Sequence, residues 1–255
     1  MLGIVLGLYL WFHSYSALLK VRQIRPNPTH RLLSVVLHFL CVAFLVVVLL
    51  TRSSSDVRSS AGWIVLYTLG GAAWLQLGLF LLSFLGVAAR DDVLERQNPA
   101  AAWVVYGAMI GITLCYAGSN IGNGPGPEVV LFCAVLSTTF LFALWLLLER
   151  LFRLADCITI ERDESVGIRA GGWLLSLGLI FGGAVTGDWV SMEGTIRDFF
   201  RYAWVALLLL LVAVVIELSF HSSLMREKAH RRASVVIAFV YFLAAAVYVV
   251  WRGAD

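Results

Sequence analysis

Long apolar runs, separated by short segments that hold most of the charged residues, constrain the fold of this chain more than any other feature of its sequence. The runs are about 18 to 27 residues long, and about 20 helical residues span the hydrocarbon core of a bilayer. Of the 255 residues, 60% are hydrophobic and 14% are charged, against about 25% charged in an ordinary globular domain. The sequence therefore predicts a single all-α domain over residues 1–255, a polytopic transmembrane bundle, and excludes a water-soluble fold.

The apolar runs predict eight transmembrane helices in four hairpins of the same orientation, at about 2–51, 62–120, 129–189 and 202–251. The first run lacks a preceding positive region and a small-residue cleavage site, so we expect a retained helix there and no signal peptide. The individual helices are expected at about 2–19, 32–51, 62–89, 100–120, 129–152, 170–189, 202–220 and 233–251.

The distribution of basic residues predicts the orientation of the helices. Fourteen of the 19 Lys and Arg residues lie in the connections after the first, third, fifth and seventh helices, and five lie on the opposite side. Because positively charged short loops stay cytoplasmic, we expect a multi-pass protein of the bacterial inner membrane with both termini on the periplasmic side. The net charge of +3 forms no basic patch for nucleic acid. The expected partners are therefore the lipid bilayer and other membrane or peripheral subunits, or a second copy of the chain.

An internal repeat relates the segments that begin at Asn98 and Arg169, 71 residues apart. Small residues and two glycines one helical turn apart follow both positions. Such small-xxx-small faces let transmembrane helices approach each other backbone to backbone, so we interpret the glycines as a helix-packing face. The alternative is that they leave backbone carbonyls open to a ligand or an ion. The glycines are Gly107 and Gly111 in the first copy and Gly178 and Gly182 in the second.

The two first positions of the repeat are expected where helices enter the membrane from the cytoplasmic side. Asn98 followed by Pro99 is typical of an N-cap and the first helical residue. Arg169 would bring positive charge to a helix N-terminus, which the helix dipole disfavours. We therefore expect Arg169 to pair with Asp163 or Glu164, or to meet phospholipid headgroups.

The Asn-x-Ala-Ala opening at Asn98, the glycines that follow it and the degenerate second copy resemble the small bacterial inner-membrane proteins grouped as domain of unknown function 350. The resemblance covers about Gly62 to Trp189, half of the chain. It implies units of four transmembrane helices and a link to envelope stress, and it implies no defined activity. The chain departs from the family pattern at Pro99, after the first Asn, and at Arg169, which replaces the second.

Glycine and proline are abundant at the expected outer end of the 100–120 helix, and they cannot continue it. A sharp structural turn is one interpretation. The other is a polar outer vestibule or ion-coordinating loop that uses Asn120, Asn123 and exposed carbonyls. Asp188, at the corresponding end of the 170–189 helix, would be the polar cap of the same vestibule.

Polar and ionisable side chains within membrane spans are costly and are therefore functional candidates. His38, Gln76 and Glu217 are expected within the membrane. An internal polar contact would explain them, and a role in transport is the alternative. Glu149 and His13 are expected at the membrane interface.

No enzymatic motif stands out, because the sequence holds no H-E-x-x-H, no G-x-S-x-G and no P-loop. The four cysteines lack C-x-x-C spacing and a histidine at ligand spacing. We therefore expect them to serve as small apolar residues and to form neither metal sites nor disulfides. The sequence thus predicts no catalytic residue, no metal site and no cofactor.

Two hypotheses on function follow. In the first, the protein is a non-enzymatic membrane-embedded subunit or scaffold of a larger complex. In the second, it is a channel or transporter whose path follows the 100–120 and 170–189 helices and opens at the polar outer vestibule. The first is favoured, because a transporter of this size usually shows more buried polar residues along its path.

Overall fold

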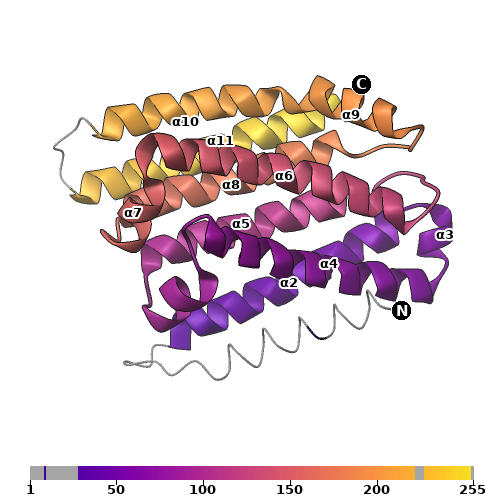
Figure 1. Ribbon diagram of the computed structural model, residues 1–255, viewed down its shortest axis with the longest axis horizontal. Helices are drawn as coiled ribbons and strands as arrows, with labels where there is room; N and C mark the ends of the chain where they lie inside the picture. The colour runs from indigo at the N-terminus through magenta and orange to yellow at the C-terminus, as the bar shows by residue number, and fades with distance from the viewer. Residues whose placement is uncertain (1–8, 10–27, 222–226, 254–255) are drawn as a thin grey trace.

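The structure of the chain, a computed structural model, describes Tyr9 and residues 28–221 and 227–253. Apart from Tyr9, the helix expected at 2–19, with His13, lies outside the described residues. Helices form most of the described part of the chain, which contains one isolated β-bridge and no β-strand (Figure 1). The helices are α2 (Pro28–Arg52), α3 (Ser55–Arg58), α4 (Ala61–Phe84), the π-helix η1 (Ala89–Glu95), α5 (Pro99–Gly118), α6 (Pro127–Phe152), α7 (Leu154–Thr159), α8 (Glu164–Ala184), α9 (Met192–Ala203), α10 (Val205–His221) and α11 (Glu227–Arg252).

Seven helical segments of the described residues are long and apolar enough to cross a membrane, which confirms the predicted all-α transmembrane bundle. Successive spans alternate in direction. The short helix α3 and the α5–α6 connection therefore lie at one end of the bundle, here called the α3 end, and η1 and α7 lie at the other, the α7 end (Figure 1). The segments are 30–52, 61–84, 99–118, 127–152, 164–184, 192–220 and 230–252.

Several expected helix boundaries differ from the structure. The helix expected at 62–89 ends at Phe84, because Gly86 takes a positive φ of +101° that a helix cannot continue. The helix expected at 170–189 begins earlier, at Glu164, because Asp163 accepts hydrogen bonds from the first free amides. The span expected at 202–220 is preceded by the amphipathic helix α9, which the sequence analysis did not predict.

The centre of the bundle is the pair formed by α5 and α8. Within the spans of these two helices 78% of the residues are buried, against 28% in α2 and α4 and 17% in α11. In Figure 1 the pair lies between α2 and α4 on one side and α10 and α11 on the other. The contact between α5 and α8 is the most extensive between any two described elements. Both helices begin at the α7 end, so they run parallel.

Equivalent backbone features recur around α5 and α8. In each case a residue with positive φ precedes the N-cap residue, and a glycine with positive φ follows the helix. These positions are Gln97, Asn98 and Gly122 around α5 and Arg162, Asp163 and Gly187 around α8. Their separation is 65 residues, as it is between Asn123 and Asp188. The expected register of 71 residues, with Asn98 equivalent to Arg169, is therefore wrong.

Candidate functional site

Glycines hold α5 and α8 in backbone contact. A Cβ atom at Gly107 would overlap the carbonyl group of Gly171, and one at Gly178 would overlap the backbone of Gly111. A Cβ atom at Gly182 would overlap the carbonyl oxygen of Leu114 in the same way. The four predicted packing glycines thus all face the partner helix. Because the facing backbone covers the carbonyls at these positions, no room for an ion is left between the two helices there.

Asn98 joins the start of α5 to α7. Its side chain, 1% exposed, accepts hydrogen bonds from the backbone amides of Ala100 and Ala101 at 3.0 and 3.4 Å. Its amide nitrogen donates to the carbonyl oxygen of Ile158, at 2.7 Å. Asn98 is therefore the N-cap that the sequence predicts, and it also connects the start of α5 to α7.

Arg169 lies inside α8, beyond the first turn, and is 3% exposed. Its Nε and Nη2 donate to the two carboxylate oxygens of Glu217 in α10, at 2.7 and 2.6 Å. Its Nη1 donates to the hydroxyl of Ser234 in α11, at 2.9 Å, and its guanidinium lies 4.4 Å from the ring centroid of Phe220. One side chain therefore joins three helices.

The expected pairing of Arg169 with Asp163 or Glu164 is wrong, because Arg169 pairs with Glu217 and both other carboxylates bind elsewhere. Asp163 caps α8 through the amides of Ser165 and Val166. Glu164 accepts hydrogen bonds from Trp103 and Arg231 instead. The early start of α8 moves the guanidinium away from both, into the interface with α10 and α11.

The remaining intramembrane candidates make local contacts. Gln76 of α4 and His38 of α2 lie 3.3 Å apart, Nε2 to Nδ1, beside a mainly apolar cavity of about 420 Å³. The carboxylate of Glu149 accepts a hydrogen bond from the backbone amide of Ala155 at 2.6 Å and so supports the start of α7.

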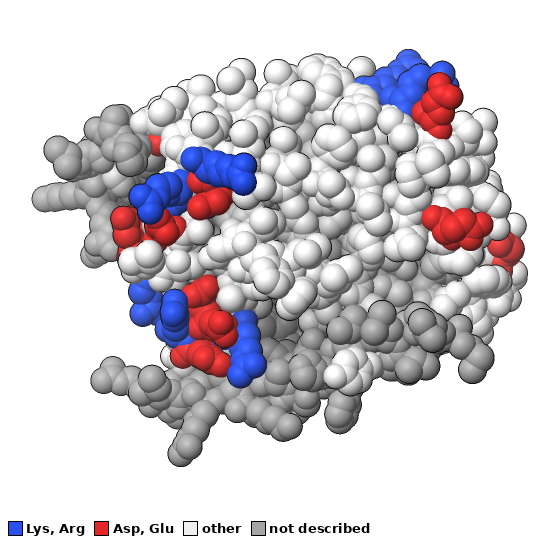
Figure 2. All heavy atoms as spheres, viewed as in Figure 1, with Lys and Arg blue, Asp and Glu red and all other residues white. Residues whose placement is uncertain are grey.

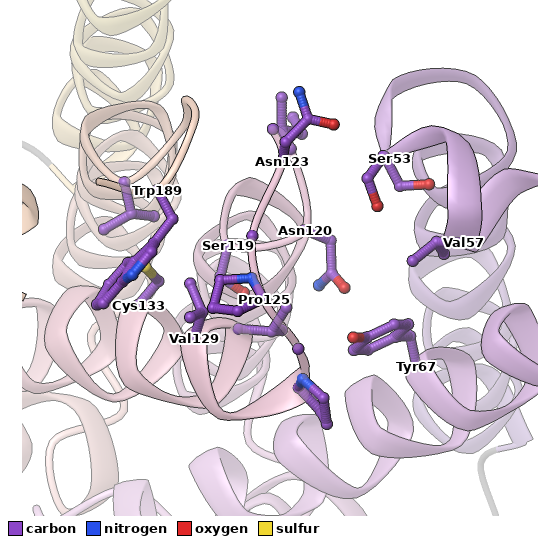
Figure 3. Close-up of a pocket in the computed structure, with 18 of the residues that line it drawn as sticks. Ser53, Val57, Tyr67, Ser119, Asn120, Asn123, Pro125, Val129, Cys133 and Trp189 are labelled. Atoms are coloured by element: carbon purple, nitrogen blue, oxygen red, sulfur yellow. The ribbon is translucent and has the colours of Figure 1, made fainter. Parts of the chain in front are cut away.

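A polar cavity of about 130 Å³ lies at the α3 end (Figure 3). Asn120 and Asn123 line it, whereas Asp188 is not among the lining residues. The carboxylate of Asp188 accepts two hydrogen bonds from Asn123, from its backbone amide at 2.8 Å and from Nδ2 at 2.9 Å. The structure thus brings the three predicted vestibule residues together. Through its hydrogen bonds to Asn123, Asp188 joins the α8–α9 connection to the α5–α6 connection.

The backbone of these two connections is also paired. The amide of Gly187 donates to the carbonyl of Ile121, and that of Trp189 donates to the carbonyl of Asn123. Gly122 has a φ of +115°, and a Cβ there would overlap the carbonyl of Gly187, so only glycine fits. These backbone contacts hold the turn after α5 in place, and the turn forms one wall of the cavity.

Sequence reasoning missed the opposite wall, which comes from the first two described spans. Ser53 follows α2, Asp56 lies in α3 and Tyr67 lies one turn after Trp63 in α4. These residues sit outside every motif of the sequence. The only available signal was an aromatic pair at the start of an apolar run, which is also typical of an ordinary membrane-interface anchor.

This geometry defines the class of the protein: a multi-pass, all-α membrane protein built around two parallel helices in backbone contact. A family model described as Domain of Unknown Function (DUF350) matches residues 56–164. These residues therefore belong to the DUF350 family, as the resemblance indicated. The matched segment includes Asn98 and the two predicted packing glycines of α5 and ends at the first residue of α8, short of the expected limit at Trp189. The comparisons with curated proteins and with solved structures found no match.

Proposed function

We propose that this protein is a non-enzymatic, membrane-embedded subunit or scaffold of a larger complex. The observation that carries the proposal is the backbone contact between α5 and α8, which fills the centre of the bundle. The two helices pack backbone to backbone along this interface, because the glycines that face the partner helix each abut one of its backbone atoms. A rigid centre of this kind suits a component that holds others in place, and the family resemblance links that role to envelope stress.

We further propose that the protein lies in the bacterial inner membrane with its α7 end in the cytoplasm. The α7 end carries most of the described basic residues outside the helix interfaces, in agreement with the positive-inside rule. The end of α11 would then be periplasmic. The basic residues counted at the α7 end are Arg90, Arg96, Arg150, Arg153, Arg162, Arg231 and Arg232.

A channel or transporter is the second candidate. The polar cavity at the α3 end of α5 favours it. Against it stands the contact between α5 and α8, since the path would have to follow these helices. The scaffold role is therefore the better supported of the two.

Two measurements test the proposed role. Purification from membranes in mild detergent, followed by native mass spectrometry, should yield the chain in a defined assembly with other subunits or with itself. Liposomes that contain the protein should pass small ions and polar solutes no faster than empty liposomes. A monomer that conducts would replace the scaffold with the transport role.

Cysteine labelling tests the orientation. Ser59, at the α3 end, and Asp91, in η1, are both exposed. In intact cells a membrane-impermeant maleimide should label Ser59→Cys and leave Asp91→Cys unlabelled until the cells are opened. The opposite pattern would reverse the proposed orientation.

A further inference from the structure

Two polar groups without partners face the cavity at the α3 end. The side chains of Tyr67 and Asn120, 6% and 5% exposed, both line the cavity and point into the same space (Figure 3). The Asn120 amide nitrogen donates to the carbonyl of Tyr116. Neither the Tyr67 hydroxyl nor the Asn120 amide oxygen has a hydrogen-bond partner among the described residues. Both atoms are open to the cavity, so a ligand there can supply the hydrogen bonds that they lack within the protein.

A carboxylate lies beside these two groups. Asp56 of α3 lines the cavity and makes no ion pair with any described residue. A hydrogen bond from the Ser54 hydroxyl lowers the pKa of Asp56, so its carboxylate is ionised at neutral pH. The nearest basic residues in sequence, Arg52 and Arg58, are not among the lining residues.

The charges at the two ends of the molecule differ in arrangement. Figure 2 shows acidic side chains without basic neighbours on part of the α3 end, whereas basic and acidic side chains alternate at the α7 end. Among the described residues of the lining itself Asp56 is the one charged residue, and its carboxylate favours a cation over an anion in the cavity.

Three of the lining side chains offer hydrogen-bond acceptors. The carboxylate of Asp56 and the amide oxygen of Asn120 accept hydrogen bonds, and the Ser53 hydroxyl can accept because its own hydrogen is donated to the carbonyl of Leu49. Three acceptors match the three donors of a primary ammonium group. The Tyr67 hydroxyl remains to donate to an oxygen next to that group.

We propose that the cavity formed by Ser53, Asp56, Tyr67 and Asn120 binds the primary ammonium group of a small amine that carries a neighbouring oxygen. A free amino alcohol has this chemistry. So does the ethanolamine headgroup of a phospholipid, which could reach the cavity because it lies where the transmembrane helices end. The proposal concerns a ligand site and stands independently of the scaffold role.

Ligand titration of the purified full-length protein tests the proposal, with the fluorescence of Trp63 and Trp189 as the signal because both line the cavity. Ethanolamine should bind saturably. Choline should bind at least about tenfold more weakly, since its quaternary nitrogen has no hydrogen to donate. Equal binding of ethanolamine and choline would overturn the ammonium assignment, as would the absence of binding by either.

Variants locate the site. Asp56→Asn should weaken ethanolamine binding about tenfold, because it replaces a charge-assisted hydrogen bond with a neutral one. Tyr67→Phe should weaken it about threefold. The matched control is Asp198→Asn, an exposed aspartate of α9 at the same end that does not line the cavity. Equal affinities in Asp56→Asn and Asp198→Asn would show that the cavity is not the binding site.

An experiment in liposomes distinguishes the two sources of the ammonium group, a lipid headgroup and a soluble amine. In phosphatidylcholine vesicles free ethanolamine should bind as it does in detergent. If phosphatidylethanolamine in the vesicles weakens that binding in the parent protein and not in Asp56→Asn, the lipid headgroup is the ligand. If it has no effect, the ligand is a soluble amine.

Discussion

Helix α8 has two neighbours that it holds in different ways. Toward α5 it presents glycines, and the two backbones meet along the whole span. Toward α10 and α11 arginine side chains make contacts at both ends of the helix: Arg169 bonds to Glu217 and Ser234, and Arg252 of α11 donates to the carbonyl of Gly183. Between them Gly172 of α8 packs closely against Ala238 of α11. The same helix thus associates with its neighbours in two ways, by close packing of backbones and by hydrogen bonds of polar side chains.

The difference teaches how helices associate where lipid removes the hydrophobic driving force. Close packing gains many weak contacts, and it needs small residues at every position of the interface. Polar bonds need few positions, and each is costly to break because its partner is then left unpaired in an apolar surrounding. We therefore expect the α8–α10–α11 interface to depend on single residues and the α5–α8 interface to depend on the whole stripe.

The largest expected effect is at Glu217. Glu217→Ala leaves the buried guanidinium of Arg169 without its carboxylate, and breaking such a pair costs about 3–5 kcal/mol. The unfolding free energy of the purified protein, measured by steric trapping or denaturant titration in detergent, should fall by that amount.

The double variant Arg169→Met with Glu217→Met is the control for this loss. Replacing both members of a buried pair with apolar residues of similar volume is often neutral. The double variant should therefore be more stable than Glu217→Ala. If it is less stable, packing and not the ion pair holds α10 against α8.

Gly107 gives the next largest effect. Gly107→Ala places a methyl group against the carbonyl of Gly171, so the helices must separate, at a cost of about 1–3 kcal/mol. The same substitution at the exposed Gly62 of α4 has only the Ser60 hydroxyl within reach, at 3.7 Å. Gly62→Ala should leave the melting temperature unchanged or raise it, and equal melting of the two variants would contradict the close-packing interpretation.

The smallest effect is expected at Arg231, whose ion pair with Glu164 lies at the exposed rim of the α8–α11 interface. The two side chains are 59% and 30% exposed. Pairs of this kind contribute about 0–1 kcal/mol, and salt screens them. Arg231→Ala should thus shift the melting temperature little, and any shift should vanish in high salt. A loss as large as that of Glu217→Ala would remove the distinction between the buried and the exposed pair.

The sequence predicted most of the fold because membrane spans leave a strong one-dimensional signal. The expected spans from 32–51 onward each correspond to a helix in the described residues, with ends that shift by several residues where turns or caps intervene. Such shifts decide contacts. Because α8 starts at Glu164, Arg169 lies in the interface with α10 and α11 and not at the N-terminus of the helix.

The repeat register was missed for a related reason. Matching letters favoured 71 residues, since small residues are common in both helices. The true register depends on backbone conformation at Gln97 and Arg162, whose positive φ values carry no signal in these residue types. Asn98 and Asp163 are different residues that cap in the same way, so a comparison of identities does not align them.

The residues of the candidate site also fall into two groups, those that the sequence could predict and those that it could not. Asn120 and Asn123 could be predicted because glycines and prolines mark their turn. Tyr67 and Asp56 could not, because only the packing of distant spans brings them to the cavity. Polar lining residues in separate helices leave no pattern in one sequence.

The parallel pairing of α5 with α8 also sets a sequence of events during synthesis. These two helices have the lowest mean hydropathy of the seven described spans, 1.6 and 1.4, so each gains less from lipid than its neighbours do. About 60 residues separate the emergence of α5 from that of α8, an interval of several seconds at a ribosomal rate of about 5–20 residues per second. During that interval the glycine stripe of α5 has no partner. The contact between the two central helices therefore forms only after α8 has emerged, several seconds later than α5.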